Sequence, residues 1–246
     1  MSIHEQDIQI LIIHVRGNEE RRQYMQQQLE KLNMPYTFVT DGNMEDLTPD
    51  ILDRYFSDDV CESPMHGIYP RTSCAYKHLL AIRHIIDNGL EGALVLEDDI
   101  RLKPTFKHVF VESLVEYRRD HNHEAGIINY EESSLMLVPR SKRHNGQILY
   151  KAKRDRFAGC LYISRNAAEA IMQYVESKKC AYTSDRLHNH LIFQGLVTYY
   201  WSHPCIACQC SADGSMPTMI PTRPRPLKRL KWFYKKIYKH ILYFIR

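Results

Sequence analysis

The sequence predicts an α/β protein with a mixed, mostly parallel central sheet flanked by helices, and three observations lead to this fold class. Short apolar runs rich in β-branched residues recur along the chain, as expected for strands that are buried on both faces. Segments with apolar residues at helical spacing separate these runs. Glycine and asparagine stand where many of these segments end. The 246 residues are enough to bury a sizeable core.

The first three predicted elements form one strand–helix–strand unit. Residues 8–13 are apolar and β-branched and predict a central strand. Residues 18–33 predict a helix, because Asn18 is a capping residue and three apolar side chains follow at helical spacing: Met25, Leu29 and Leu32. Residues 36–40 predict the second strand, which ends at Asp41-Gly42. Such a unit places parallel strands side by side through a right-handed crossover, with the loops after both strands at one edge of the sheet.

The rest of the chain continues this alternation. Residues 43–70 are acidic and irregular, and predict short helices and a surface loop. Helices are predicted over 73–86, 104–119 and 166–175, and strands over 93–96, 126–130 and 160–163. The basic stretch 140–156 fits neither pattern and predicts a flexible loop.

The net charge of +4 conceals an uneven distribution. Residues 221–246 hold nine Lys or Arg and no Asp or Glu, which leaves 24 basic and 29 acidic groups, a net −5, on the other 220 residues. The acidic body argues against nucleic acid as a partner, and the basic tail points to an anionic partner of its own.

The tail predicts an amphipathic helix that follows Pro221, Pro224 and Pro226. One face is apolar and aromatic: Leu230, Phe233, Tyr234, Ile237, Tyr238, Ile241 and Ile245. Lysines lie opposite this face or at its border: Lys228, Lys231, Lys235, Lys236 and Lys239. Residues 227–246 are suited to an anionic membrane surface, where each basic group contributes ~1 kcal/mol. Docking on the body or on a partner subunit is the alternative. The chain is thus predicted to divide into a domain of residues 1–220 and a segment of residues 221–246.

Several features predict a cytoplasmic protein. No segment approaches the ~20 apolar residues that span a bilayer, and residues 1–7 lack the Lys or Arg of a secretory signal. Seven cysteines, an odd number, favour reduced thiols over a disulfide framework. Cys205, Cys208 and Cys210 lie close to His203 and form a candidate zinc site, although small residues on a buried strand or loop are the favoured interpretation.

The most informative feature is the acidic triplet Glu97-Asp98-Asp99 at the end of an apolar predicted strand. Adjacent carboxylates repel one another, and a divalent cation such as Mn²⁺ or Mg²⁺ relieves that repulsion while it binds substrate phosphates. Side chains i and i+2 of an extended segment point the same way, so Glu97 and Asp99 can share a ligand. The sequence has no glycine-rich phosphate loop, which favours a metal as the group that holds a diphosphate. A solvated acidic turn is the alternative.

Short segments in order over residues 8–210 resemble glycosyltransferase family 25, the bacterial lipooligosaccharide β-glycosyltransferases and their collagen-modifying relatives. The segments are His14–Arg22, Thr40–Gly42, Ser73–His78, Leu94–Asp99, Gly159–Ala167, Tyr182–Asp185 and His203-Pro204 with Gln209. Within the third segment, Ser73 stands for the family's glycine and Lys77 for its serine.

The resemblance implies a GT-A-type nucleotide-sugar-binding fold, an inverting mechanism, a UDP-sugar donor and a divalent metal. Galactose is the expected hexose, and the expected acceptor is a lipid-linked lipooligosaccharide or lipopolysaccharide sugar. Together with the basic tail, this predicts a peripheral protein on the cytoplasmic face of the inner membrane. Two other functions compete with this one: a membrane-bound glycan-binding protein without turnover, and a metal-dependent nucleotidyltransferase that releases pyrophosphate.

An inverting transfer needs one general base for the acceptor hydroxyl. The resemblance favours Asp185 as this base, and the alternative is that Asp185 caps a helix that begins at Arg186. Glu131 and then Glu132, which follow a predicted strand, are the next candidates.

The remaining site candidates lie near the predicted strand ends. The expected binders of the nucleotide sugar are Val15, Arg16, Arg21, Asp41, His78, Glu97 and Asp98. Solvated charges are the alternative for the arginines, a plain turn for Asp41-Gly42, and a satisfied buried histidine for His78. Asp99 and Glu97 are the expected metal ligands, with His203 taken as the third from a set that also includes His188 and His190.

Overall fold

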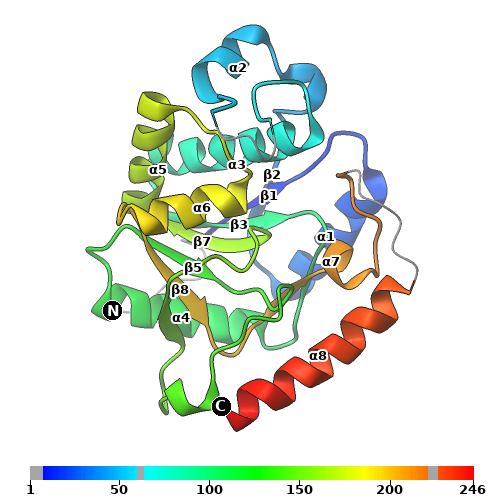
Figure 1. Ribbon diagram of the computed structural model, residues 1–246, viewed down its shortest axis with the longest axis vertical. Coiled ribbons are helices and arrows are strands. Elements are labelled where there is room, and N and C mark those ends of the chain that lie inside the picture. Colours follow the sequence, from blue (N-terminus) through cyan, green and yellow to red (C-terminus); the bar gives the residue numbers. More distant parts are fainter. Residues whose placement is uncertain (1–7, 60–63, 221–226) are drawn as a thin grey trace.

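A computed structural model describes residues 8–59, 64–220 and 227–246 (Figure 1). Seven strands form one sheet in the order β2-β1-β3-β7-β5-β8-β6. Their bounds are β1 (Gln9–Ile13), β2 (Tyr36–Val39), β3 (Gly92–Glu97), β5 (Gly126–Asn129), β6 (Leu149–Ala152), β7 (Cys160–Ser164) and β8 (Thr198–Ser202). Strands β1, β2, β3, β5 and β8 run in one direction, and β6 and β7 run against them. The predicted mixed, mostly parallel sheet is therefore confirmed.

Helices cover both faces of the sheet. Their bounds are α1 (Glu19–Leu32), α2 (Pro49–Tyr55), α3 (Pro70–Asp87), α4 (Phe106–Asp120), α5 (Arg165–Lys178), α6 (Ser184–Phe193), α7 (Cys210–Asp213) and α8 (Lys228–Ile245), with short 3-10 turns η2 (Met44–Asp46) and η3 (Arg140–Lys142). Figure 1 shows α3, α5 and α6 on one side of the sheet and α4 on the other. Each side buries its own hydrophobic cluster, so the strands are apolar on both faces.

Strand β1 illustrates why these residues form a central strand. Leu11 and Ile13 face the cluster that includes Leu79 of α3. Ile10 and Ile12, on the opposite face, pack in the cluster that includes Met25 and Leu29 of α1. Because successive side chains of a strand alternate, a continuous run of branched apolar residues fills both layers at once.

The predicted strand–helix–strand unit is present with its expected boundaries. The Asn18 side chain accepts a hydrogen bond from the Arg21 amide (3.3 Å), which caps the start of α1. Asn33 ends the helix in the left-handed conformation, with φ 49° and ψ 49°. Strands β1 and β2 are parallel, with Ile10 opposite Tyr36.

Residues 140–156 are not the flexible loop that the sequence predicts. They contain η3 and strand β6, which pairs antiparallel with β8 at the edge of the sheet. The carboxylate of Glu116 on α4 accepts the amides of Ile148 (2.8 Å) and Leu149 (3.1 Å) and so fixes the start of β6. The strand was not predicted because the stretch is basic and because Leu149 is the only fully buried side chain of β6.

Two further differences concern short elements. Helix α3 begins at Pro70, three residues before the predicted start, because proline suits the first turn of a helix. A second sheet, β4 (Ile100–Leu102) with β9 (Ala207–Gln209), follows the acidic triplet and was not predicted. Residues 1–7 and the predicted helix-breaking prolines Pro221, Pro224 and Pro226 lie outside the described residues.

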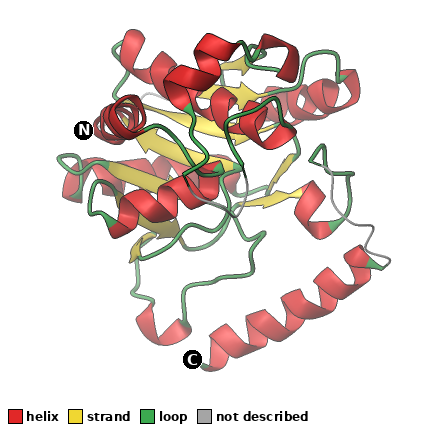
Figure 2. Cartoon of the chain, turned by 45° about the horizontal axis from the view of Figure 1, so that its top comes forward, coloured by secondary structure: helices red, strands yellow, loops and turns green. Residues whose placement is uncertain are grey.

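Helix α8 runs along the outside of the body (Figures 1 and 2). Lys236 pairs with Glu132, the Trp232 indole donates to the Ser133 carbonyl (3.4 Å), and the Arg140 guanidinium lies 4.4 Å from the centre of the Phe244 ring. No residue of α8 is buried. Within the described part of the chain, no helix is both long and apolar enough to cross a membrane.

Candidate functional site

A cavity of about 530 Å³ opens at the edge of the sheet where β1 and β3 end. The acidic triplet lies on its wall, since Glu97 is the last residue of β3 and Asp98-Asp99 form the turn into β4. Segments far apart in sequence complete the wall, among them Val15, Arg21, Cys74, Lys77, Phe157, Asp185, Gln209, Ser211, Ile220 and Lys228. The loops after parallel strands meet here, which is where ligands bind in open α/β sheets.

Asp98 is occupied by protein contacts. Its Oδ1 accepts from Arg21 Nη1 (2.6 Å), and its Oδ2 lies 2.9 Å from His14 Nδ1 and accepts more weakly from the Val15 amide (3.4 Å). Burial would raise the pKa of Asp98, but the His14 hydrogen bond and the Arg21 charge hold that pKa below its ordinary value. Asp98 therefore joins the triplet to the ends of β1 and α1.

Asp99 differs from Asp98 because its carboxylate is buried and only partly satisfied. Oδ2 accepts the Ser211 amide (3.1 Å), whereas Oδ1 has no hydrogen-bond partner among the residues that the structure describes. Burial, followed by the negative charge of Glu97, raises the pKa of Asp99 to about 6. An orphaned buried oxygen beside a second carboxylate fits a divalent cation.

Glu97 is the more accessible carboxylate, with 21% of its side chain exposed. Gln209 Nε2 donates to one of its oxygens, and the other lies 3.3 Å from His78 Nε2 and 3.9 Å from Cys74 Sγ. Cys74 and His78 are one turn apart on α3. Together with Glu97 they form the one group of three potential metal ligands found among the described residues.

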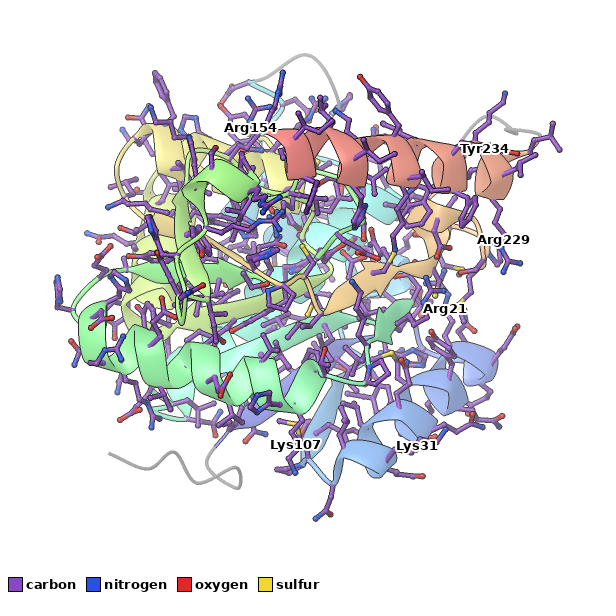
Figure 3. The ribbon with its side chains drawn as sticks, turned by 90° about the horizontal axis from the view of Figure 1, so that it is seen from below. Arg21, Lys31, Lys107, Arg154, Arg229 and Tyr234 are labelled. Atoms are coloured by element: carbon purple, nitrogen blue, oxygen red, sulfur yellow. The ribbon has the colours of Figure 1, made fainter. Side chains whose placement is uncertain are left out.

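Of the two arginines expected in the nucleotide-sugar site, Arg16 and Arg21, only Arg21 lines the cavity. Its Nη2 donates to the Pro217 carbonyl (2.6 Å) and lies 3.9 Å from Asp99 Oδ2. Figure 3 shows Arg21 on α1, beside the C-terminal part of the chain. The guanidinium is largely buried on the wall of the cavity, and both of its terminal nitrogens are bonded to protein groups.

Arg16 and Asp41, both expected in the nucleotide-sugar site, do not line the cavity. Arg16 is half-exposed and pairs with Asp46 (3.0 Å), and 85% of the Asp41 side chain is exposed. Gly42 has φ +83°, a conformation that favours glycine, in the loop between β2 and η2. The neighbouring Asn43 lines the cavity in their place and caps η2.

Asp185 lines the cavity from the second position of α6. It does not cap the helix, because Thr183 holds the capping position and accepts the Leu187 amide through its carbonyl (2.8 Å). The Thr183 hydroxyl donates to Asp185 Oδ1 (2.7 Å). Cys74 lines the same cavity as Asp185, and burial, then the charges of the triplet and of Asp185, raise the pKa of its thiol.

Glu131 is not placed to act as a base. It is fully buried, one oxygen accepts the amides of Gly159 (2.5 Å) and Cys160 (3.0 Å), and the other accepts the Ser133 hydroxyl (2.5 Å). Burial raises its pKa well above the ordinary value. The hydrogen bonds of its two oxygens make the side chain a buried cross-link between the end of β5 and the start of β7. Glu132, the next candidate, is neutralised by Lys103 and Lys236.

The three histidines considered as metal ligands lie elsewhere. His203 follows β8, beside the Tyr150 ring, and burial followed by the charges of Arg143 and Arg156 lowers its pKa to about 4. Two nearby cations make this a poor position for a metal ligand. His188 is buried against Asp155 (2.8 Å), and His190 stacks on Tyr182.

The cysteine group is structural. Cys205, Cys208 and Cys210 are buried free thiols, and with His203 they do not form a ligand group in the part of the chain that the structure describes. Cys208 lies on β9, in agreement with the favoured interpretation of small residues on a buried strand.

Other residues of the cavity carry no local signal in the sequence. Ser211, whose amide reaches Asp99, and Lys228, which donates to the Ser211 carbonyl, are brought in by α7 and α8. Lys77 on α3 donates to the carbonyls of Thr40 (3.1 Å) and Asp41 (2.9 Å) at the end of β2. Burial lowers the pKa of Lys77 to about 8. These residues reach the cavity only through contacts between segments that are distant in sequence, so sequence patterns alone did not identify them.

Comparison with known proteins gives one family. The sequence model of glycosyltransferase family 25 (LPS biosynthesis protein) matches residues 7–188, which include the triplet, Asp185 and every strand of the seven-stranded sheet except β8. No protein of curated function matches the chain.

Among solved structures, the crystal structure of mannose-1-phosphate geranyltransferase from Thermus thermophilus aligns at 11% identity with a TM-score of 0.29. The alignment covers 96% of this chain and 66% of that one, so this chain spans slightly less than two thirds of that protein. A likeness of this degree defines neither the fold nor the chemistry of the cavity.

Proposed function

The chain belongs to glycosyltransferase family 25, and from this premise we propose that it transfers a hexose from a UDP-sugar to a lipooligosaccharide or lipopolysaccharide acceptor sugar with inversion. Galactose is the favoured hexose. Membership of a family of LPS biosynthesis proteins implies a nucleotide-sugar donor and an oligosaccharide acceptor. The observation that carries the proposal is the half-satisfied carboxylate of Asp99, which shares one cavity with Arg21 and Asp185.

The donor diphosphate is proposed to lie against Arg21 and the triplet. Glu97 and Asp99 are the residues that would hold a divalent cation, Mn²⁺ or Mg²⁺, because Asp98 is already neutralised by Arg21 and His14. Cys74 and His78 lie close enough to Glu97 to join the ligands. When bound, the cation offsets the negative charge that develops on the leaving UDP.

Asp185 is the proposed general base. It lines the same cavity as the triplet. The Thr183 hydroxyl donates to Oδ1 of its carboxylate and not to Oδ2. In the proposed step, the acceptor hydroxyl oxygen forms a bond to the anomeric carbon as the bond from that carbon to the diphosphate oxygen breaks. The hydroxyl proton passes to Asp185, and UDP leaves with the electron pair.

Helix α8 is proposed to hold the enzyme on an anionic membrane at the cytoplasmic face of the inner membrane, where lipid-linked acceptors are available. The body contacts one side of the helix, through Lys228, Trp232 and Lys236. The opposite side leaves between 44% and 77% of each apolar or aromatic residue exposed: Leu230, Phe233, Tyr234, Ile237, Tyr238, Ile241 and Ile245. An exposed apolar face flanked by lysines matches a membrane interface. The helix thus combines contact with the body and a free apolar face, which the sequence treated as alternatives.

A donor screen tests the proposal. Purified protein is incubated with UDP-galactose, UDP-glucose or UDP-N-acetylglucosamine and deacylated core oligosaccharide, in Mn²⁺ or in EDTA, and released UDP is measured. We expect metal-dependent release that Asp99→Asn abolishes and that Asp87→Asn, an exposed carboxylate at the end of α3, leaves unchanged. Pyrophosphate release from a nucleoside triphosphate would instead favour the nucleotidyltransferase. Binding of the oligosaccharide without turnover would favour the glycan-binding protein.

A further inference from the structure

A second cavity of about 400 Å³ adjoins the first. Two residues, Phe157 and Asp185, line both cavities. The proposed donor cavity contains the triplet, and the second cavity contains none of it. The proposed base therefore lies at the junction, which is the position from which it could reach a hydroxyl group in the second cavity.

Phe157 has an unusual backbone conformation. Its φ is +105°, a value that favours glycine and strains a residue with a bulky side chain. The Phe157 amide donates to Asp155 Oδ1 (3.1 Å), and the Phe157 carbonyl accepts from Asn129 Nδ2 (2.6 Å). Both peptide groups that flank the side chain are thus fixed by buried polar residues, while 39% of Phe157 remains exposed.

A buried polar network holds the Phe157 loop in place. Asp155 binds His188 (2.8 Å), Asn129 (2.9 Å) and Tyr199, and each of these side chains is at most 4% exposed. The four residues come from β5, β8, α6 and the loop itself. Buried networks of this kind rigidify the elements that they join, so the strained conformation of Phe157 is enforced by the surrounding fold.

The same contacts fix Phe157 relative to Asp185. Asn189 on α6 accepts the Asp155 amide through Oδ1 (2.8 Å) and donates through Nδ2 to the Asp185 carbonyl (2.9 Å). His188, the preceding residue, binds the Asp155 side chain. Two consecutive residues of α6 therefore lock the loop that carries Phe157 to the helix turn that carries Asp185.

We propose that the second cavity is the acceptor-sugar subsite and that Phe157 is the aromatic platform on which the acceptor pyranose ring stacks, with Asp185 beside the reacting hydroxyl. The apolar C–H face of a pyranose matches an exposed aromatic ring, and its hydroxyl groups need a few polar partners of the kind that surround this ring. This inference rests on the proposed function. It adds the location of the acceptor and a residue that determines acceptor binding.

Steady-state kinetics with deacylated core oligosaccharide as the acceptor probe test the subsite. For Phe157→Ala, the KM for the oligosaccharide should rise about tenfold, which corresponds to about 1.4 kcal/mol, and far more than the KM for the UDP-sugar. Phe157→Tyr, which keeps the ring, should stay within about threefold of the wild type for both substrates. Phe193→Ala is the matched control, because Phe193 is 86% exposed at the end of α6 and lines neither cavity.

Phe157→Gly provides a second variant that relieves the backbone strain, so its thermal stability should not fall while its KM for the oligosaccharide rises as in Phe157→Ala. An unchanged acceptor KM in both variants would overturn the proposal, as would equal increases in the two KM values. Failure of the wild-type protein to bind or hydrolyse any UDP-sugar would instead refute the proposed function, and the two failures are therefore distinguishable.

Discussion

Arg21 Nη1 donates to Asp98 Oδ1 over 2.6 Å and thereby connects the first turn of α1 to the turn that carries the acidic triplet. The two residues are 77 positions apart in sequence, and both are largely buried. The pair divides the triplet, because Asp98 is neutralised by protein while Glu97 and Asp99 remain for a ligand.

Arg21→Met should destabilise the protein by about 3 kcal/mol, because it leaves a buried carboxylate with His14 as its main partner. Urea unfolding would measure this loss as a lower free energy of unfolding. Arg22→Met is the control, since Arg22 lies over the Phe38 ring and its removal should cost at most about 1 kcal/mol. Equal losses in the two variants would show that the Arg21–Asp98 pair has no special role.

Asp99→Asn should stabilise the metal-free protein at neutral pH. The native pKa of about 6 lies above the ordinary 3.8, so between these values the native state binds more protons than the unfolded state. Stability therefore falls as the pH rises through this window, and the loss is complete above about pH 6. Asparagine cannot ionise, so the variant should gain on the order of 2 kcal/mol at pH 7.5.

Urea unfolding in EDTA at pH 4.5 and pH 7.5 measures this effect. The difference in unfolding free energy between Asp99→Asn and the wild type should be larger at pH 7.5 than at pH 4.5. Asp87→Asn, on an exposed residue, should show the same small difference at both values. A pH-independent effect of Asp99→Asn would contradict the raised pKa.

The central sheet could be predicted because its strands are continuous apolar runs and its helices have apolar faces. Gln9–Ile13 and Gly92–Glu97 are each buried on both sides, so their composition alone identifies them. Strand β6 was missed because it is short, lies at a sheet edge and has Lys151 exposed in its centre, with only Leu149 fully buried. Strands β4 and β9 have three residues each, too few for any periodicity.

The site was predictable in position but not in detail. An acidic triplet at a strand end marks the edge of the sheet where ligands bind. Which carboxylates remain available depends on contacts between distant residues, such as Arg21 with Asp98 and Gly159 with Glu131. His203 illustrates the same limit, because only the fold brings it near the charges of Arg143 and Arg156.

Asp185→Asn and Glu131→Gln should differ strongly in their effect on kcat, although both residues were candidate bases. Asp185→Asn should lower kcat at least about 100-fold with little change in the KM for the UDP-sugar. Glu131→Gln should leave kcat within about threefold, because Glu131 lines neither cavity and both of its oxygens are engaged by protein groups. A large loss of kcat in Glu131→Gln with normal stability would reverse the assignment.

The exposed face of α8 gives the last prediction. Figure 3 shows Tyr234 and Arg229 on this helix at the edge of the molecule. Ile237→Asp combined with Ile241→Asp should reduce co-sedimentation with phosphatidylglycerol-containing vesicles at least tenfold, because it places two negative charges in the centre of the apolar face. Both residues are about half exposed, so the melting temperature should stay within a few degrees of the wild type.

Salt and lipid composition separate this interaction from non-specific adsorption. Binding of the wild type should weaken in roughly 0.5 M NaCl, because salt screens the attraction between the lysines and anionic lipids; the Debye length is about 10 Å at ~0.1 M and shorter at higher concentrations. Binding should also be weaker on vesicles of phosphatidylcholine alone. Phe193→Asp combined with Leu196→Asp is the matched control, since it puts the same two charges on exposed apolar residues outside α8. If that control lost binding as completely as the α8 variant, the effect would come from net charge, and the apolar face of α8 would have no specific role in membrane binding.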